Sequence, residues 1–236
     1  TNAEQENTVL MTAVYENDVE EYLYILPPDD MAERWTGRRL KPAEIEELSG
    51  ITNTRYVDAF MDSLWTYLRV KGITKVYLDF DKLDAKEPDT ESYRLAKYIQ
   101  KEFPFVQIKN LQDYLRAQRT IKKPCEIEAL RKAEEITGEA IVAMMKASKP
   151  GMYEYQYKVL AQHGVLMSGF PSIISAGDNN FCIHYYDYRG QAKDGDMILN
   201  DVGARWNHEI NDVSRGWPCN GRFNEKQKLL YQCAYN

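Results

Sequence analysis

Two aspartates, Asp201 and Asp212, each follow a short apolar run and lie eleven positions apart in "LNDVGARWNHEINDVSRGWP", residues 199–218. The runs "MILND" and "EIND" are typical of neighbouring strands, and Gly203 to Asn207 can form the bend that joins them. Such a hairpin would bring both carboxylates to one point. Facing carboxylates repel each other unless a cation lies between them, and oxygen-rich sites suit divalent ions such as Mn²⁺. The pair predicts a metal site, against the simpler interpretation that each aspartate caps a turn.

A histidine, His184, stands in "GDNNFCIHYY", where we expect another apolar strand to end. Beside a carboxylate-bound metal, a histidine can hydrogen-bond a substrate carbonyl or a tetrahedral intermediate. The alternative is a histidine that serves only the fold, which is the commoner case for a single histidine at a strand end. His163 and His208 have no partner at metal-ligand spacing, and we interpret both as structural.

A second aspartate pair, Asp79 and Asp81 in "YLDFDKL", gives a rival hypothesis. It resembles the nucleophile motif of haloacid-dehalogenase-like phosphatases. That motif has Thr or Val two residues after the second aspartate, where this chain has Leu83, and no later acidic pair follows on a matching strand. The sequence also has no phosphate-binding glycine loop of either common type. We favour a strand that runs into a solvated turn.

The composition narrows the class of protein. The chain has 236 residues, of which 44% are hydrophobic and 28% charged, as is ordinary for a globular protein of one or two domains. A net charge of −6 argues against a general affinity for nucleic acid or for an anionic membrane. No apolar stretch is long enough to cross a bilayer. Four cysteines without CxxC spacing favour free thiols and a cytoplasmic location.

The elements that must position these residues divide the chain in two. Residues 1–118 alternate strands and helices, which predicts an α/β domain. The expected strands are 8–14, 21–26, 75–81 and 106–108, and the expected helices are 41–48, 57–70, 90–103 and 111–119. Residues 119–236 begin with a long amphipathic helix from Pro124 and a shorter second helix. Short apolar runs divided by Gly, Asn and Asp then predict an antiparallel sheet, so this part is α+β.

Three stretches together resemble one known family. They are "PSIISAGDNNFCIHYYDY", "DGDMILNDVGA" and "NDVSRGWPCNGRF", and they are similar to the proline-peptidase branch of the pita-bread metallopeptidases, the Xaa-Pro aminopeptidases and Xaa-Pro dipeptidases. "IKKPCEIEALRKAEEIT" resembles the opening helix of that catalytic domain, and "AERWTGRRL" resembles a segment of the N-terminal domain of bacterial Xaa-Pro aminopeptidases. The resemblance implies a creatinase-like N-terminal α/β domain over 1–118, incomplete at its start, followed by the first half of a pita-bread domain over 119–236.

The resemblance also implies roles for the candidate residues. Asp201 would chelate one metal ion, Asp212 would bridge two, and His184 would contact the substrate near the scissile bond. Water activated by two divalent ions, with manganese expected, would attack the carbonyl of the residue before proline. The expected substrate is a peptide with proline at its second position, and the expected assembly is a homodimer.

Departures from the family limit this expectation. The family takes one His and two Glu ligands from the second half of its catalytic domain, whereas Glu225 is the only carboxylate after Asp212 and no His follows it. The chain also begins without Met and stops within a helical pattern. We therefore expect part of a longer Xaa-Pro aminopeptidase, inactive as printed and at best a weak metal binder. A non-catalytic peptide-binding module and an Xaa-Pro dipeptidase remain alternatives.

Overall fold

The computed structural model describes residues 3–162 and 167–235, so His163 lies outside the described residues. The chain forms two compact units, Thr1–Arg119 and Thr120–Asn236, and each has its own hydrophobic core. Within the described ranges, none of the helices combines the length and the apolar character that a membrane span requires.

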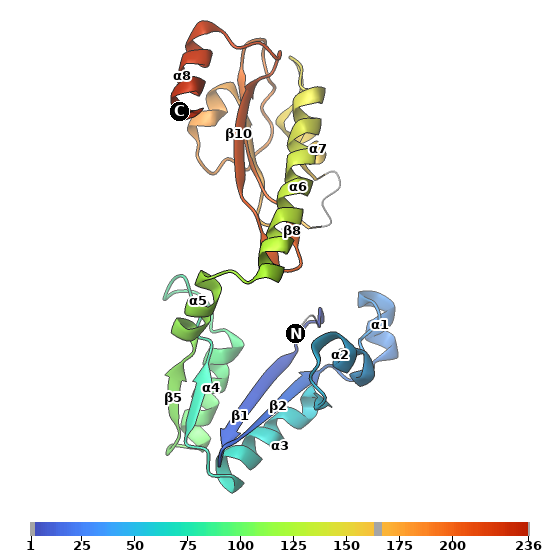
Figure 1. The fold of residues 1–236 in the computed structure, drawn as a ribbon, viewed down its shortest axis with the longest axis vertical. Coiled ribbons are helices and arrows are strands. Elements are labelled where there is room, and N and C mark those ends of the chain that lie inside the picture. The colour runs from blue at the N-terminus through green and yellow to red at the C-terminus, as the bar shows by residue number, and fades with distance from the viewer. Residues whose placement is uncertain (1–2, 163–166, 236) are drawn as a thin grey trace. The chain divides into compact units, whose positions relative to one another are not determined.

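The first unit mixes helices with two small sheets (Figure 1). Its elements in chain order are β1 (Val9–Tyr15), β2 (Asp18–Ile25), α1 (Asp30–Thr36), α2 (Pro42–Ser49), β3 (Thr54–Tyr56), the 3₁₀ turn η1 (Val57–Ala59), α3 (Phe60–Trp65), the π-helical turn η2 (Thr66–Val70), β4 (Lys75–Leu78), α4 (Glu91–Glu102), β5 (Gln107–Asn110) and α5 (Gln112–Thr120).

A tight hairpin opens this unit. β1 and β2 pair antiparallel up to Tyr15 and Asp18, so the connection is Glu16–Asn17. Both residues have positive φ, 53° and 80°, as the two-residue turns that match strand twist require. β3 then pairs parallel to β2, and β4 pairs parallel to β5. The predicted strands and the predicted mixture of helices and sheets are confirmed here.

The helix expected over 57–70 is present in three pieces, η1, α3 and η2. Its apolar side still packs as one face, because Leu64 and Leu68 lie in one core cluster with Ile99 and Phe103 of the α4 region. The last piece, η2, ends at Val70, and Gly72 follows it with a φ of 70°, the left-handed conformation that glycine adopts most readily.

The second unit consists of helices packed on an antiparallel sheet. Its elements in chain order are α6 (Pro124–Ala147), α7 (Glu154–Ala161), β6 (Ile173–Ala176), the 3₁₀ turn η3 (Gly177–Phe181), β7 (Met197–Val202), β8 (Arg205–Trp206), β9 (Glu209–Ile210), β10 (Val213–Pro218) and α8 (Glu225–Tyr235).

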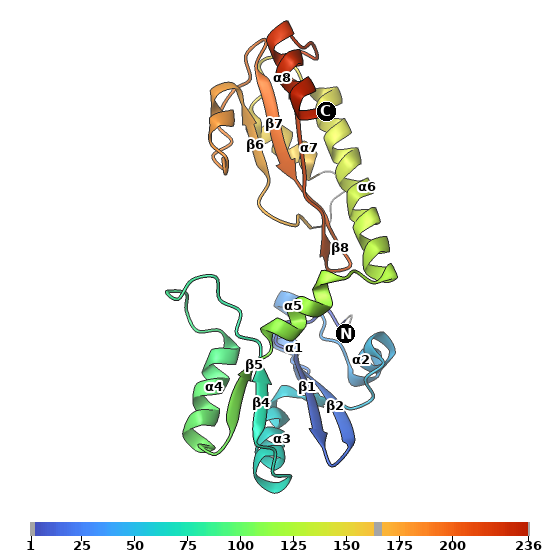
Figure 2. The same ribbon diagram turned by 60° about the vertical axis from the view of Figure 1, so that its left-hand side comes forward.

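The main sheet of this unit has the order β10-β7-β6 with both pairings antiparallel. Figures 1 and 2 show α6 and α7 alongside it. Along β7, every second residue is buried against these helices: Ile198, Asn200 and Val202. Leu199 and Asp201 point to the opposite face, which is less covered. The strand period of two therefore places Asp201 on the open face.

The expectation of a strand ending at His184 is wrong. The apolar strand is β6, all four of whose residues are buried, and it ends at Ala176. The chain then turns through η3 and continues without regular structure. Phe181 and Ile183 are 89% and 80% exposed, so their apolar run does not mark a buried strand.

Candidate functional site

Asp201 and Asp212 lie on one face of the β7–β10 pair. Asp201 pairs with Ser214 across the two strands, and cross-strand partners share a face. Asp212 comes two residues before Ser214, so the strand period places its side chain on that face as well. The two aspartates are thus diagonal neighbours, as the sequence predicted.

A small hairpin, β8–β9, joins the strands that carry the aspartates. Its tip is Asn207 and His208, with φ of 46° and 69°, rather than the expected bend over Gly203 to Asn207. Gly203 is required instead for a close approach between two backbone segments. A Cβ added there would lie 1.9 Å from the backbone oxygen of Asn211. The chain passes itself at this contact, directly beside both aspartates, and only a glycine leaves room for it.

The same crossing is fixed to α6 by a buried polar group. Asn211 is 6% exposed, and its Oδ1 accepts hydrogen bonds from Thr137 Oγ1 at 2.9 Å and from the Ala204 amide at 2.8 Å. The Ala204 amide also lies 3.0 Å from Thr137 Oγ1. The bonds to Asn211 Oδ1 fix its position against α6, whereas its Nδ2 has no hydrogen-bond partner among the described residues. Because these buried bonds hold one geometry, helix α6 sets the register of the hairpin.

The electrostatics of the aspartate pair follow from this closeness. Asp201 accepts a hydrogen bond from Ser214 Oγ at 2.8 Å. The Asp201 carboxyl group also lies within hydrogen-bonding reach of Asp212 and raises the pKa of that residue; desolvation and the like charge of Asp201 raise it further. A divalent cation between the two groups would reverse the effect of the like charge.

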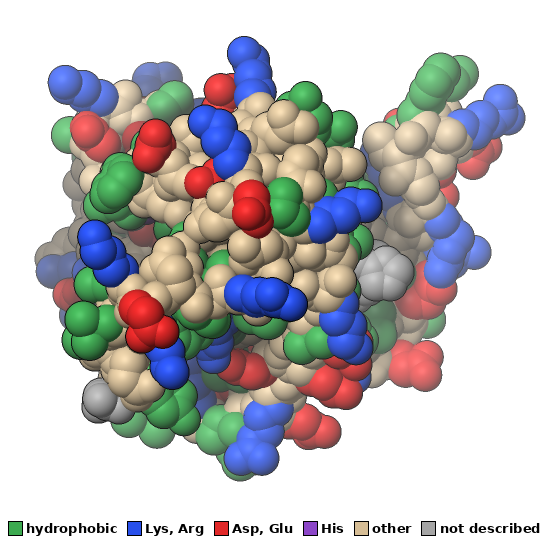
Figure 3. All heavy atoms as spheres, turned by 90° about the horizontal axis from the view of Figure 1, so that it is seen from above, with side chains coloured by type: hydrophobic (Ala, Val, Ile, Leu, Met, Phe, Trp, Pro, Cys, Tyr) green, Lys and Arg blue, Asp and Glu red, His purple; other side chains and the backbone are tan. Residues whose placement is uncertain are grey.

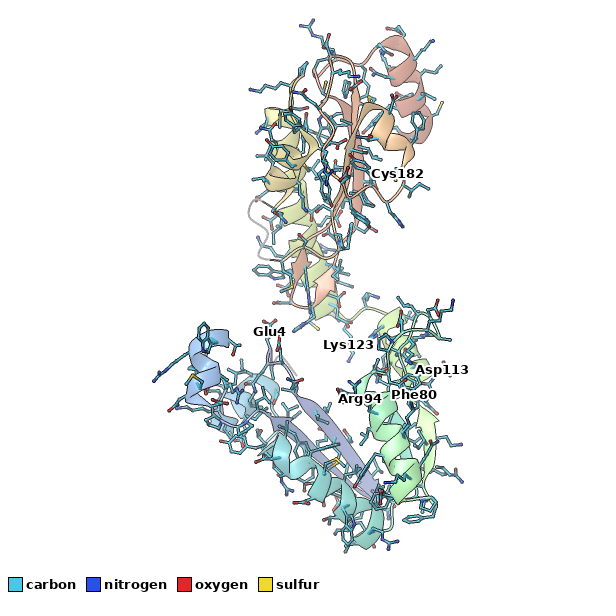
Figure 4. The ribbon with its side chains drawn as sticks, turned by 180° about the vertical axis from the view of Figure 1, so that it is seen from behind. Glu4, Phe80, Arg94, Asp113, Lys123 and Cys182 are labelled. Carbon is cyan, nitrogen blue, oxygen red and sulfur yellow. The ribbon has the colours of Figure 1, made fainter. Side chains whose placement is uncertain are left out.

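His184 lies on the exposed segment between η3 and β7. Its ring stacks on that of Tyr186, with centroids 6.3 Å apart and planes 23° from parallel. Cys182, labelled in Figure 4, lies two residues before it. Among the described contacts, His184 is joined to Tyr186 and to neither aspartate. The structure therefore brings the two aspartates together and leaves His184 on a separate segment.

That segment nevertheless starts on the aspartate face of the sheet. Ser175 pairs with Leu199 across β6 and β7, on the same face as Asp201. Its hydroxyl donates to Asn180 Oδ1 at 2.6 Å, and Asn180 Nδ2 donates to the backbone oxygen of Met197 at 2.9 Å. The η3 turn is thus fastened over this face.

Figure 3 shows the molecule from above, with acidic and basic side chains interspersed and no patch of one sign on the surface in view.

The described residues supply two carboxylates and no larger set. No group of three or more His, Cys, Asp and Glu that could hold a metal ion occurs in the part of the chain that the structure describes. The rival pair is not organised as a phosphatase site either: Asp79 accepts a hydrogen bond from the side chain of the buried Gln112 just beyond β4. This contact supports the interpretation of a strand that ends in a turn.

One residue near the site was missed from the sequence. Glu154 is fully buried in the first turn of α7, although its type favours the surface. Its carboxylate accepts hydrogen bonds from both ends of the segment that carries His184. The available signal was weak: a glutamate at a helix start between two tyrosines, in "GMYEYQY".

Comparison with protein families gives two matches. The model of metallopeptidase family M24 matches residues 128–236. The model of the aminopeptidase P N-terminal domain matches residues 1–77. The two models thus fall in the two units of the chain, and the first covers both aspartates and His184.

Curated relatives agree with these models. An Xaa-Pro aminopeptidase of Haemophilus influenzae is 26% identical over 98% of this chain and 53% of its own length. The human Xaa-Pro dipeptidase is 34% identical over 49% of this chain and 26% of its own length. The chain therefore spans about half the length of the relative that it matches throughout.

Solved structures show the same fold. A Bacillus anthracis protein described as an aminopeptidase P superposes with a TM-score of 0.94 at 28% identity, over 99% of this chain and 57% of that one. Zinc-substituted aminopeptidase P of Escherichia coli, solved with product, has a TM-score of 0.82 at 24% identity, over 95% of this chain and 53% of that one. The predicted fold class is confirmed.

Proposed function

Since the chain belongs to the proline-peptidase branch of metallopeptidase family M24, we propose that the protein is a metal-dependent Xaa-Pro aminopeptidase. It would release the N-terminal residue of a peptide whose second residue is proline. The observation that carries the proposal is the aspartate pair: Asp201 and Asp212 share one face of adjacent strands, at a crossing that only Gly203 permits.

The donor chemistry of this pair fits divalent ions. Two carboxylates with mutual repulsion favour a hard or borderline cation, and manganese suits an oxygen-rich site. We propose that Asp201 and Asp212 bind the metal and that Ser214, which donates to Asp201 Oδ1, keeps that carboxylate oriented. Bound divalent ions would supply a water that is nucleophilic at neutral pH and would polarise the peptide carbonyl.

The fit is partial in this chain. A dinuclear centre needs more ligands than two aspartates, and the described residues hold no larger ligand cluster. We therefore propose that these 236 residues alone have negligible peptidase activity and that further ligands come from elsewhere in the native protein.

His184 is proposed as a substrate contact. It is exposed, and the segment that carries it is fastened over the aspartate face by Asn180. A neutral imidazole there could donate a hydrogen bond to the substrate carbonyl or to the oxyanion that forms from it. This role needs no metal ligation by the histidine.

An aminopeptidase is favoured over a dipeptidase by the extent of similarity. The Xaa-Pro aminopeptidase of H. influenzae aligns with 98% of this chain, whereas the human dipeptidase aligns with 49%. The N-terminal unit also matches the aminopeptidase P domain. The dipeptidase remains a second candidate because its local identity is higher, at 34%. A cytoplasmic homodimer is part of the same proposal.

The test uses the gene product at its natural length, purified with Mn²⁺. It should release the first residue of an Xaa-Pro-Yaa tripeptide, and a chelator should abolish the reaction. An Xaa-Ala-Yaa tripeptide is the matched control and should be cleaved slowly or not at all. Preference for an Xaa-Pro dipeptide would favour the dipeptidase. Tight peptide binding without metal or cleavage would instead establish the non-catalytic module and refute the proposal.

A further inference from the structure

A buried carboxylate lies at the base of the segment that carries His184. Glu154 is 0% exposed and belongs to the first turn of α7. Its Oε1 accepts hydrogen bonds from the Ala176 amide and from Asn179 Nδ2, both at 2.8 Å. Its Oε2 accepts from Tyr185 Oη at 2.8 Å and from the Gly190 amide at 2.7 Å. Four donors compensate the burial of one carboxylate.

These donors are not a random set of neighbours. Ala176 is the last residue of β6, where the segment leaves the sheet, and Gly190 is where the segment returns to α7. The Glu154 amide also donates to the Gly190 oxygen at 2.9 Å, and the Tyr155 amide donates to the Tyr188 oxygen at 3.1 Å. The base of segment 177–190 is therefore closed by the Glu154 side chain, which joins its two ends, and by two backbone bonds from the start of α7.

The packing at the base leaves no spare volume. A Cβ added to Gly190 would lie 2.4 Å from Asn179 Nδ2 and 2.6 Å from Glu154 Oε1. Gly190 is thus required by the approach of its backbone to the carboxylate, and a side chain there would push the hydrogen-bonded groups apart.

Tyr185 connects this base to the functional candidate. It follows His184 directly, and its hydroxyl lies 2.8 Å from Glu154 Oε2 and 3.0 Å from Asn179 Nδ2. Its ring also meets Tyr188 edge-on, with centroids 6.5 Å apart. The Tyr185 side chain is thus held at both its ring and its hydroxyl. This restricts the backbone of the adjacent His184, although the side chain of His184 is exposed.

We propose that Glu154 is a positioning residue that orders segment 177–190 and thereby holds His184 on the aspartate side of the sheet. The ordering role of Glu154 is independent of the proposed function, and only the contact of His184 with a substrate rests on it. It adds a residue of α7, remote in sequence from Asp201 and Asp212, to the determinants of substrate orientation.

The first test measures order and needs no activity. Glu154→Gln keeps the volume but replaces one acceptor oxygen with an amide group that faces two donors. We expect hydrogen exchange of amides in 177–190 to accelerate about tenfold or more, because a charged buried acceptor is lost. Exchange in β7 and β10 should stay unchanged, and so should all exchange in the control Glu135→Gln, an exposed glutamate of α6. Unchanged exchange in 177–190 would overturn the proposal.

A second variant serves if Glu154→Gln does not fold. Tyr185→Phe removes one donor and leaves the carboxylate in place with three. It should shift and broaden the His184 imidazole resonances in NMR spectra of histidine-labelled protein, while the His208 resonances stay in place. His184 resonances identical to those of the parent would contradict the role assigned to this contact.

The activity test uses the native-length enzyme. Glu154→Gln should lower kcat about 10- to 100-fold, the range for residues that orient groups around a metal site, with a smaller change in KM. In a His184→Ala background the same substitution should have little further effect, because both act through one group. Additive losses would indicate a purely structural role and overturn the proposal.

The two proposals fail in distinguishable ways. If neither parent nor variant cleaves an Xaa-Pro peptide but exchange and NMR respond as expected, the peptidase assignment fails and the positioning role stands. If the parent is active and Glu154→Gln matches it in kcat, the positioning role fails and the peptidase assignment stands.

Discussion

Asp212 keeps its proton to a higher pH than an isolated aspartate, chiefly because the Asp201 carboxyl group lies within hydrogen-bonding reach. A divalent ion would take the place of that proton, so metal binding should release protons and should weaken as the pH falls. The pair thus couples metal affinity to pH through two residues on adjacent strands.

Replacing Asp212 tests this at the residue scale. In Asp212→Asn the affinity for Mn²⁺, measured by titration calorimetry, should fall at least about tenfold, since even supporting residues have that effect. The free energy of unfolding without metal should not fall, because one of two like charges is removed. Asp194→Asn is the control: Asp194 is exposed and accepts a hydrogen bond from Asn220. Parent-like affinity in Asp212→Asn would exclude Asp212 as a ligand.

Two glycines near the aspartates should respond differently to the same change. Gly203→Ala places a Cβ 1.9 Å from the Asn211 oxygen, whereas Gly216→Ala on β10 meets its nearest atom, the Ile198 oxygen, at 3.4 Å. We expect Gly203→Ala to destabilise the protein by about 1–3 kcal/mol or more, as overpacking does, and to weaken metal binding. Gly216→Ala should change the denaturation midpoint little. Equal effects of both variants would contradict the crossing described here.

At the scale of elements, the sequence predicted the helices that have a periodic apolar face. The apolar spacing after Pro124 identified α6, and the helix expected over 41–48 corresponds to α2, Pro42–Ser49. Helix α1 was not identified as an element because it buries no residue and so has no apolar stripe to recognise. The run around Ile183 was taken for a strand because composition records hydrophobicity, not whether another layer covers it.

The candidate site was predictable to the same degree. Asp201 and Asp212 could be paired from two strands and a turn, since strand period alone decides which face they share. Glu154 could not be found this way. Its role depends on four donors from residues up to 36 positions away, and no local pattern encodes that approach.

Helix α6 offers a stabilising substitution. Gly138 lies on its exposed side, and a Cβ added there meets nothing within 4 Å. Gly138→Ala should therefore stabilise the protein by about 0.5–1 kcal/mol, because alanine loses less backbone freedom in a helix. Chemical denaturation measures the change, and the Mn²⁺ affinity should stay as in the parent. A destabilised variant would show that the helix is crowded at this position.

At the scale of the whole molecule, each unit contains a carboxyl group with a shifted pKa, and the two shifts change the folding stability in opposite directions as the pH falls. In the first unit, hydrogen bonds from Tyr15, Tyr67 and Tyr22 lower the pKa of Glu20 from 4.5 to about 2. A lowered pKa stabilises the fold above pH 4.5, and this contribution is lost as the pH falls toward 2. In the second unit, the raised pKa of Asp212 has the reverse sign, so its protonation favours the fold as the pH falls.

Glu20→Gln tests this difference. The unfolding midpoint of the first unit should depend less on pH between 4.5 and 2 in the variant than in the parent, because the ionised acceptor is gone. The transition of the second unit should not change. Calorimetric scans at several pH values measure both, with Glu47→Gln, an exposed glutamate of α2, as the control. An unaltered pH profile would mean that the tyrosine cluster does not stabilise the ionised form of Glu20.

The buried hydrogen bond between Thr137 and Asn211 has a consequence for the folding kinetics. It joins residues 74 positions apart, and the Trp217–Ser148 bond joins residues 69 apart. Closing loops of this length costs chain entropy before any contact offsets it, and a fold rich in such contacts forms slowly. Helix α6 and the hairpin that carries the aspartates can each form early from local contacts, because Asp201 and Asp212 are only eleven positions apart and meet through the β7–β10 pairing. Docking of the hairpin on α6 closes the long loops and is expected later, so the metal ligands would meet before the buried Thr137–Asn211 contact fixes their geometry.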